Sequence, residues 1–182
     1  LAGDGEVFAS PHYRSILKEL DRNKYPDLRL LILTNGVLFS RQQWDFFENI
    51  HGLLHGVSVS IDAASEGTYS ILRRGGDWGK LLVNLDFLSE LRQAGEISYL
   101  DLNFVVQKQN YREMKGFVAL GKRLGVDKIR FAQLHNDLAS YSEQQYADLN
   151  VYDHRHPCHE ELRTILEDAV FRDEIVIVPA AS

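Results

Sequence analysis

Cysteine is almost absent from this sequence, since Cys158 is the only one among 182 residues. One thiol cannot form an internal disulfide, a four-cysteine zinc site or a complete thiolate ligand set for an iron–sulfur cluster. The sequence also has no apolar run of about 18 residues and no basic segment followed by an apolar one at its start. We therefore expect no membrane association and a cytoplasmic location.

Positive charge is not in excess either, because 20 lysines and arginines face 26 acidic residues, for a formal net charge of -6. This balance gives no broad electrostatic attraction for nucleic acid or an anionic membrane. The composition, 45% hydrophobic and 25% charged, is typical of a globular protein. We expect a single domain over residues 1–182, with a small molecule or a peptide as its partner.

Apolar, β-branched runs alternate with segments of helical spacing. The runs indicate strands buried in a parallel sheet and lie at 28–36, 56–65, 99–110, 127–136 and 174–180, after a truncated strand at the start. Strict alternation of this kind predicts an α/β fold, either an open doubly wound sheet or a barrel or part of one. The stretch 137–158 is expected to be a long irregular connection.

Helix boundaries carry recognisable signals. Ser10 before Pro11, the capping-box patterns at 40–43 and 110–113, and Asp77 before Trp78 indicate helix starts. Gly95 and Gly125 stand where helices end. A further helix is expected to start at Pro157, with His156 near its cap.

Polar residues gather where the predicted strands end, and in parallel α/β folds ligands bind at that edge. The candidates, in chain order, are Gly3, Asp4, Gly5, Glu6, Thr34, Asn35, Ser60, Asp62, Asn103 and Gln133. Some of them have a second interpretation: Asn35 with Gly36 can be a plain turn, and Ser60 with Asp62 a buried hydrogen-bonded pair. Arg73 and Arg74 can be a solvated or salt-bridged helix end or can reach an anionic ligand.

The stretch "GDGE" at 3–6 combines glycines with carboxylates. A dinucleotide-binding fingerprint would need glycine at position 8, where this chain has Phe8, and the acids would repel a phosphate. Backbone carbonyls flanked by Asp4 and Glu6 favour an ammonium group instead. Alternatively, Glu6 stabilises the first turn of the next helix through its dipole.

Four segments in this order resemble the radical S-adenosylmethionine (SAM) enzymes over roughly residues 1–136. They read "LAGDGEVFASP", "LILTNG", "VSVSIDAASEGTYSILRRGGDWGKLLVNLDFL" and "NFVVQKQNYREMKGFVALGKRLGVDKIRF". The resemblance implies a partial TIM barrel of the (β/α)6 type that lacks its first β/α unit. Residues 1–136 would form the core units, 137–158 a loop, and 159–182 a final helix and strand.

The resemblance also implies cofactor contacts. Residues 3–6 would contact the amino group of SAM, and Ser60 or Asp62 its ribose or methionine moiety. Backbone near Val105 and residues 131–134 would line the adenine site. The sequence departs from the family motif at Asp4 and Val7.

The signature of that family, C-x3-C-x2-C, is absent. Three thiolates of this motif would hold a 4Fe-4S cluster beside SAM. We therefore expect a fragment or truncated form of an enzyme that modifies a peptide or small organic substrate by radical chemistry, with the cluster in the parent protein and not in this chain. The alternative is a non-catalytic binding or interaction domain on the same scaffold. A missing first strand would leave an exposed sheet edge, which favours a dimer.

A second candidate site is "HRHPCHEE" at 154–161. His154, His156, Cys158 and His159 are chemically able to bind zinc or iron. Their spacing favours a helix start after a loop over a metal site. A contact with substrate and the metal centre of an unrelated hydrolase are two further interpretations of the same residues.

Overall fold

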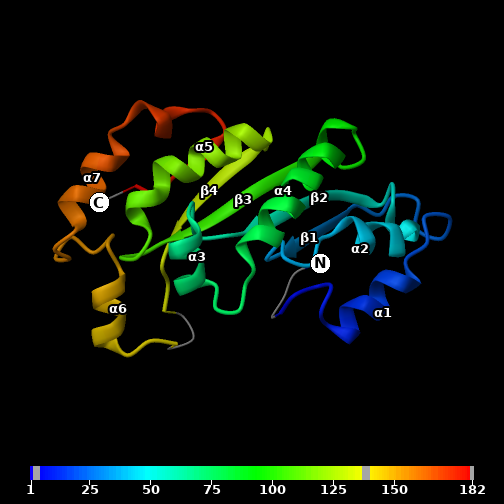
Figure 1. Cartoon of the computed structure of the whole chain (residues 1–182), viewed down its shortest axis with the longest axis horizontal. Coiled ribbons are helices and arrows are strands. Elements are labelled where there is room, and N and C mark those ends of the chain that lie inside the picture. The colour runs from blue at the N-terminus through cyan, green and yellow to red at the C-terminus, as the bar shows by residue number, and fades with distance from the viewer. Residues whose placement is uncertain (2–4, 137–139, 181–182) are drawn as a thin grey trace.

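The computed structural model describes residues 1, 5–136 and 140–180 as a mixed α/β fold around a five-stranded parallel sheet (Figure 1). The strands are β1 Leu30–Thr34, β2 Leu54–Ser60, β3 Tyr99–Val106, β4 Lys128–Gln133 and β5 Val176–Ile177. The α-helices in the described part are α1 Pro11–Glu19, α2 Arg41–Phe46, α3 Glu66–Leu72, α4 Trp78–Gln93, α5 Met114–Leu124, α6 Glu143–Leu149 and α7 His159–Leu166. Three short 3-10 turns lie at Glu48–Ile50, Tyr111–Glu113 and Ala169–Arg172.

The sheet order is β1-β2-β3-β4-β5, so that every strand pairs with its neighbour in sequence. The alternation predicted from the sequence is thus confirmed, with all pairs parallel. A doubly wound sheet reverses its strand order at a switch point, and this sheet does not. The polar ends of β1 to β4 therefore follow one another along a single rim.

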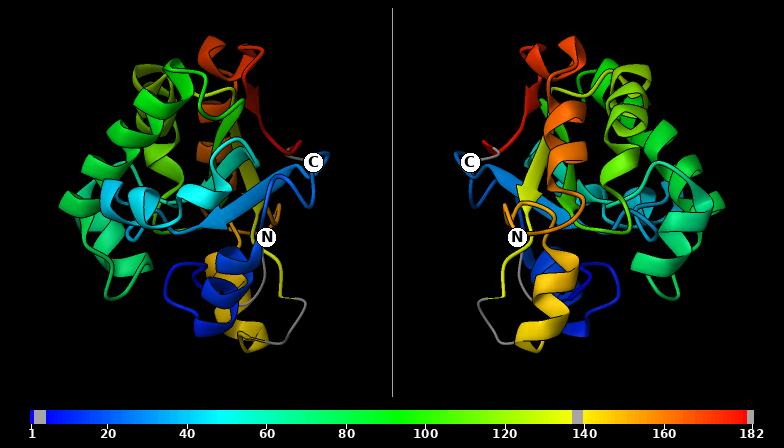
Figure 2. Two further views of the ribbon diagram at one scale, coloured as in Figure 1. Left: turned by 90° about the vertical axis from the view of Figure 1, so that its right-hand side faces the viewer. Right: turned by 90° about the vertical axis from the view of Figure 1, so that its left-hand side faces the viewer.

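Helices α4 and α5 cover one face of the sheet (Figure 2). Val59 of β2 faces Leu81 of α4, and Ile129 of β4 faces Gly121 of α5. Side chains on this face are fully buried, as the strict alternation of β1 illustrates: Ile32 has no exposed area, whereas Leu31 and Leu33 beside it are 46% and 45% exposed. The core therefore lies between the sheet and these helices.

The other face of the sheet is partly exposed, and we call it the open face. In-register pairing places on it Leu31, Leu33, Ser58, Ser60, Tyr99, Asp101, Asn103, Lys128, Arg130 and Ile177. Most of these side chains carry a charge or a hydroxyl, which is unusual in a parallel sheet, where both faces are commonly apolar and covered.

Residue 1 lies alongside β1. The amino group of Leu1 donates to the carbonyl of Leu31, and the amide of Leu33 donates to the carbonyl of Leu1 at 3.0 Å. In a parallel ladder one residue bonds in this way to both neighbours of its partner. The contact agrees with the strand segment expected at the start of the sequence.

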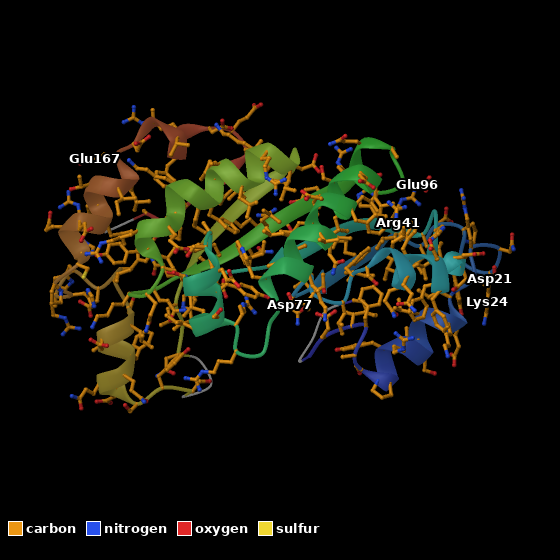
Figure 3. All side chains as sticks on the ribbon, in the orientation of Figure 1. Asp21, Lys24, Arg41, Asp77, Glu96 and Glu167 are labelled. Carbon is orange, nitrogen blue, oxygen red and sulfur yellow. The ribbon has the colours of Figure 1, made fainter. Side chains whose placement is uncertain are left out.

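Most helix starts match their sequence signals. The side chains of Ser10, Ser40 and Asp77 accept hydrogen bonds from the backbone three residues later, and Figure 3 shows Asp77 and Glu96 at opposite ends of α4. The capping box predicted at 110–113 is wrong, because Asn110 precedes the 3-10 turn Tyr111–Glu113 but its side chain makes no capping hydrogen bond. It is fully buried, accepts from the amide of Gln107 and donates to the carbonyls of Asp62 and Val105, and so joins the ends of β2 and β3.

The last third of the chain differs from expectation. The connection 137–158 is not irregular throughout, because α6 lies within it, started by a capping box between Ser142 and Gln145. Helix α7 begins at His159 and not at Pro157, since the Nδ1 atom of His156 accepts the amide of Cys158 and holds a turn there. Strand β5 ends at Ile177, two residues before Pro179, which has no amide to donate.

None of the helices in the described ranges has the length and apolar character that crossing a membrane requires.

Gly36 follows β1 and provides a stability test. Its φ is 79°, and a β-carbon there would lie 2.7 Å from Leu81 Cδ1 and 2.9 Å from Val59 Cγ1. Gly95 has a similar φ of 77° but has no atom within 4 Å of such a β-carbon. In urea denaturation we expect Gly95→Ala to cost about 1–2 kcal/mol from backbone strain alone. Gly36→Ala should cost a further 1–3 kcal/mol or so from overpacking. Equal losses would contradict the tight packing of this turn.

Candidate functional site

Glu6 is bound to the carboxyl end of β1. Its Oε1 and Oε2 atoms accept the hydroxyl of Thr34 at 2.8 and 2.9 Å, and Oε2 also accepts the amide of Asn35 at 2.8 Å. These bonds connect the turn before α1 to the sheet and fix the position of the carboxylate. A helix-dipole role alone does not describe this arrangement, because the Glu6 side chain reaches the sheet rim.

Two cavities of about 350 and 520 Å³ adjoin at this rim and share Glu6, Asn35 and Arg73 in their walls. The remaining wall of the smaller cavity consists of Gly5, Leu33, Thr34 and Ser60. The larger one extends toward the end of α3 and the loop after it, and is lined further by Ala9, Val37, Leu38, Tyr69, Leu72, Arg74, Gly75 and Gly76. A carboxylate and a guanidinium thus border both cavities.

Asp62 holds Arg73 in this position. The Nη2 atom of Arg73 lies 2.5 Å from Asp62 Oδ2, and Asp62 Oδ1 accepts the amide of Val105 at 2.7 Å. Asp62 has a φ of 63°, a left-handed conformation that Asp tolerates better than most residues. Its side chain is 11% exposed, against 29% for Arg73. Burial raises the pKa of the Asp62 carboxyl above its usual 3.8, and the neighbouring Arg73 partly opposes this.

The structure brings five of the ten predicted site residues together: Gly5, Glu6, Thr34, Asn35 and Ser60 line the smaller cavity. Asp62 lies behind Arg73 and acts on the cavities through it. Asn103 donates to the hydroxyl of Ser58 on the open face, and Gln133 contacts the carbonyl of Ala180 at the end of β4. Gly3 and Asp4 lie outside the described residues. The smaller cavity is therefore lined by predicted residues of β1 and β2, whereas Asn103 of β3 and Gln133 of β4 are not among the residues that line it.

Arg73 is the residue whose importance the sequence conveys least. Its position at the end of α3 predicts a solvated or salt-bridged helix terminus, but the sequence does not name the partner of such a salt bridge. The structure shows the salt bridge, with Asp62 eleven residues earlier, and places Arg73 at the border of both cavities. A buried acid at a strand end followed by an arginine one helix later is the signal that could have identified this pair.

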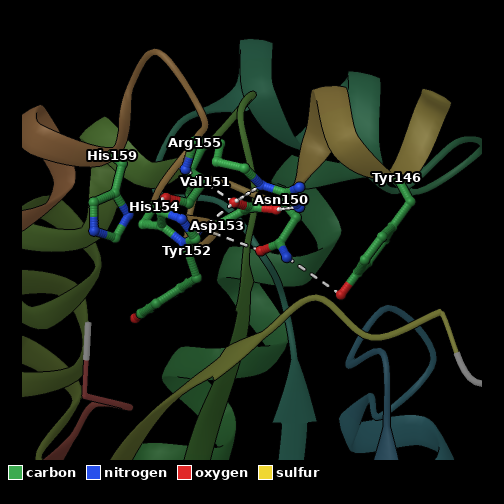
Figure 4. Close-up of polar contacts among 8 residues, drawn as sticks. All are labelled: Tyr146, Asn150, Val151, Tyr152, Asp153, His154, Arg155 and His159. Atoms are coloured by element: carbon green, nitrogen blue, oxygen red, sulfur yellow. Dashed lines mark hydrogen bonds and ion pairs between the residues drawn. The ribbon is translucent and has the colours of Figure 1, made fainter. Parts of the chain in front are cut away.

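His156 and His159 form hydrogen bonds within the α6–α7 connection, whereas the side chain of His154 is 77% exposed. His156 Nε2 contacts the carbonyl of Asp148 at 3.0 Å, and His159 Nδ1 contacts that of Val151 at 3.1 Å. Figure 4 shows the adjacent turn, in which Asn150 bonds to Tyr146 and Tyr152. Among the described residues, no three or more His, Cys, Asp or Glu side chains form a group that could hold a metal ion. These contacts account for both buried histidines as parts of the α6–α7 connection.

The Asp62 carboxyl provides a pH test. Because its pKa is raised in the folded state, the stability it contributes is complete below the unfolded value near 3.8 and is lost as pH rises through the folded pKa. Asp62→Asn keeps the left-handed backbone accessible and removes this titration. In urea denaturation, we expect the stability of the unmodified protein relative to this variant to fall as pH increases from about 3.5 to 7. A relative stability that grows with pH would show that Arg73 outweighs burial and lowers the pKa.

Comparison with known structures supports the fold described above. No protein-family profile matches the chain, and no curated protein matches it in sequence. Its fold is similar to a solved structure of TYW1 with a lysine-pyruvate adduct bound, with a TM-score of 0.57 and 20% identity. The match covers 92% of this chain and 49% of the TYW1 chain, so this chain spans about half the length of that structure. TYW1 is a radical SAM enzyme, and at this identity the similarity shows a radical SAM-like fold only.

Proposed function

We propose that this chain is the SAM-binding part of a radical SAM enzyme with a (β/α)6-type partial barrel, and that it serves the modification of a peptide or small organic substrate. One observation carries the proposal: Glu6 and Arg73, of opposite charge, border the same two adjoining cavities at the carboxyl ends of parallel strands. The fold similarity to TYW1 supports the same conclusion.

The charges suit the amino-acid end of SAM. Its carboxylate requires a cation, which Arg73 provides, and its ammonium requires an anion or carbonyl oxygens, which Glu6 and the backbone near Gly5 provide. The hydroxyl of Ser60, on the wall of the smaller cavity, is available to the methionine or ribose moiety. Cavities of about 350 and 520 Å³ are of the size that small ligands occupy.

The two charged groups are positioned before any ligand arrives. Asp62 fixes Arg73, and Thr34 with Asn35 fixes Glu6. The loop beyond Arg73 packs closely as well, because a β-carbon at Gly76 would lie 2.6 Å from the Tyr69 hydroxyl. Fixing both groups in advance reduces the ordering cost of binding and so increases affinity.

The second cofactor of the family does not fit this chain. In these enzymes SAM supplies a 5′-deoxyadenosyl radical when a 4Fe-4S cluster reduces it, and three cysteine thiolates hold that cluster. This sequence contains Cys158 alone. The alternative function is a non-catalytic binding or interaction domain on the same scaffold.

Binding of SAM by isothermal titration calorimetry tests the proposal. Arg73→Gln should weaken binding about tenfold, because the carboxylate loses a charge-assisted pair. Arg123→Gln is the matched control, since Arg123 pairs with Asp86 on the surface and lines neither cavity, and the affinity of this variant should stay close to that of the unmodified protein. Should Arg73→Gln unfold because it leaves Asp62 unpaired, Arg73→Gln with Asp62→Asn replaces it. No binding of SAM, or equal losses in the two arginine variants, would refute the assignment.

Anaerobic reconstitution with iron and sulfide tests whether this chain can hold a 4Fe-4S cluster by itself. We expect iron well below four atoms per chain, since one thiolate cannot hold a 4Fe-4S cluster. Electron paramagnetic resonance and iron analysis of untagged protein, with Cys158→Ser as the control, give the measurement. A stable 4Fe-4S signal that Cys158→Ser leaves intact would show that other groups hold a cluster.

A further inference from the structure

Arg130 projects from β4 onto the open face of the sheet and is fixed there. Its Nε donates to Asp101 Oδ2 at 2.8 Å, and its Nη2 donates to the hydroxyl of Tyr99 at 2.8 Å. The side chain is nevertheless 44% exposed. No group in the described part of the chain accepts from Nη1, so one edge of the guanidinium stays available to a ligand.

Asp101 is incompletely solvated in this arrangement. Its side chain is only 5% exposed, and within the described ranges its Oδ1 atom has no hydrogen-bond partner. An unsatisfied buried carboxylate oxygen is unfavourable and calls for an explanation. Its other oxygen, Oδ2, accepts hydrogen bonds from Arg130 Nε and, at 3.2 Å, from the hydroxyl of Tyr99. The Asp101 carboxylate therefore orients the guanidinium of Arg130, although its own Oδ1 atom is left without a hydrogen-bond partner.

Lys128 adds a positive charge beside this pair. It stands in register with Asp101, and its Nζ donates to the backbone carbonyl of Glu174 at 2.9 Å. No carboxylate of the described residues lies within ion-pair distance of it. Arg130 and Lys128 against Asp101 leave one net positive charge on this part of the open face.

Apolar surface lies next to the guanidinium. Ile177 of β5 pairs in register with Arg130 and is 40% exposed. On the other side Asn103 pairs with Arg130 and also with Ser60, which borders the smaller cavity. Two strand spacings, about 10 Å, therefore separate Arg130 from the residue that borders the candidate SAM site.

We propose that Arg130 binds the carboxylate of a small organic acid whose short apolar chain contacts Ile177. A planar carboxylate matches the free edge of a fixed guanidinium, and its single charge matches the net charge of this surface. A phosphate group carries about -1.5 to -2 near neutral pH and would exceed that charge. If the proposed function holds, this acid is the class of substrate that the enzyme modifies, and only this role rests on the proposed function. Binding of the acid at Arg130 does not require SAM.

Titration with isobutyrate, followed on the arginine Nε–H signals of 15N-labelled protein, tests this inference without SAM. We expect a saturable shift of the Arg130 signal, which its loss in Arg130→Gln identifies. Affinity should fall about tenfold in Arg130→Gln and in Arg130→Lys, which keeps the charge and loses the fork. Arg123→Gln is the matched control, since Arg123 pairs with Asp86 on the surface and should leave binding unchanged.

Isobutyramide, which has the same shape without the charge, should not bind, and inorganic phosphate at equal ionic strength should bind more weakly than isobutyrate. Tighter binding of phosphate, or equal losses in the Arg130 and Arg123 variants, would overturn the inference. Arg130→Lys keeps the test valid if Arg130→Gln does not fold. Isobutyrate binding without any SAM binding would overturn the proposed function and leave this site standing.

Discussion

The buried carboxylate of Asp62 is the constraint on which the rim of the sheet depends. Through one oxygen it holds the amide of Val105 in β3, and through the other it holds Arg73 after α3. Its backbone carbonyl is in turn bound by Asn110. Two strand ends and one helix end thus meet at a single residue, and the positive side of both cavities is placed by a group that borders neither of them.

Asp101 fixes Arg130 in the same way as Asp62 fixes Arg73. Arg73 is paired with Asp62, and Arg130 is paired with Asp101, and in each case the acid is the more buried partner. Pairs of this kind contribute little to net stability, because desolvation offsets much of the attraction. Their effect is on geometry, since each fixes a guanidinium that would otherwise sample many rotamers. One lies at the rim and the other on the open face.

The strands and helix starts that could be predicted depend on residues close to one another in the sequence. Apolar side chains marked β1 to β4, because one face of each strand packs in the core; the expected burial of both faces was wrong, since the open face is partly exposed. Ser10, Ser40 and Asp77 marked helix starts, because the capping bonds involve neighbours three residues away. The rim residues of β1 and β2 were found because parallel strands bring their carboxyl ends to one edge.

What could not be predicted depends on contacts between distant residues. Asn110 matched a capping pattern, but burial against Asp62 and Val105 gave it other partners. Asp101 resembled an ordinary polar position in a strand, and its relation to Arg130 appears only once β3 and β4 are in register. The motif of Ser142 and Gln145 was present in the sequence, but the surrounding polar composition hid a short helix.

Asn84 of α4 attaches the rim of the sheet to the helices that cover it. Its amide group donates to the carbonyls of Gly36 and Val37 at 2.9 and 2.8 Å, so the turn after β1 is attached to the middle of a long helix. Val37 is part of the wall of the larger cavity. An outward movement of this wall would have to break both hydrogen bonds or carry α4 along with the turn, so the shape of the cavity is coupled to the position of a helix that does not line it.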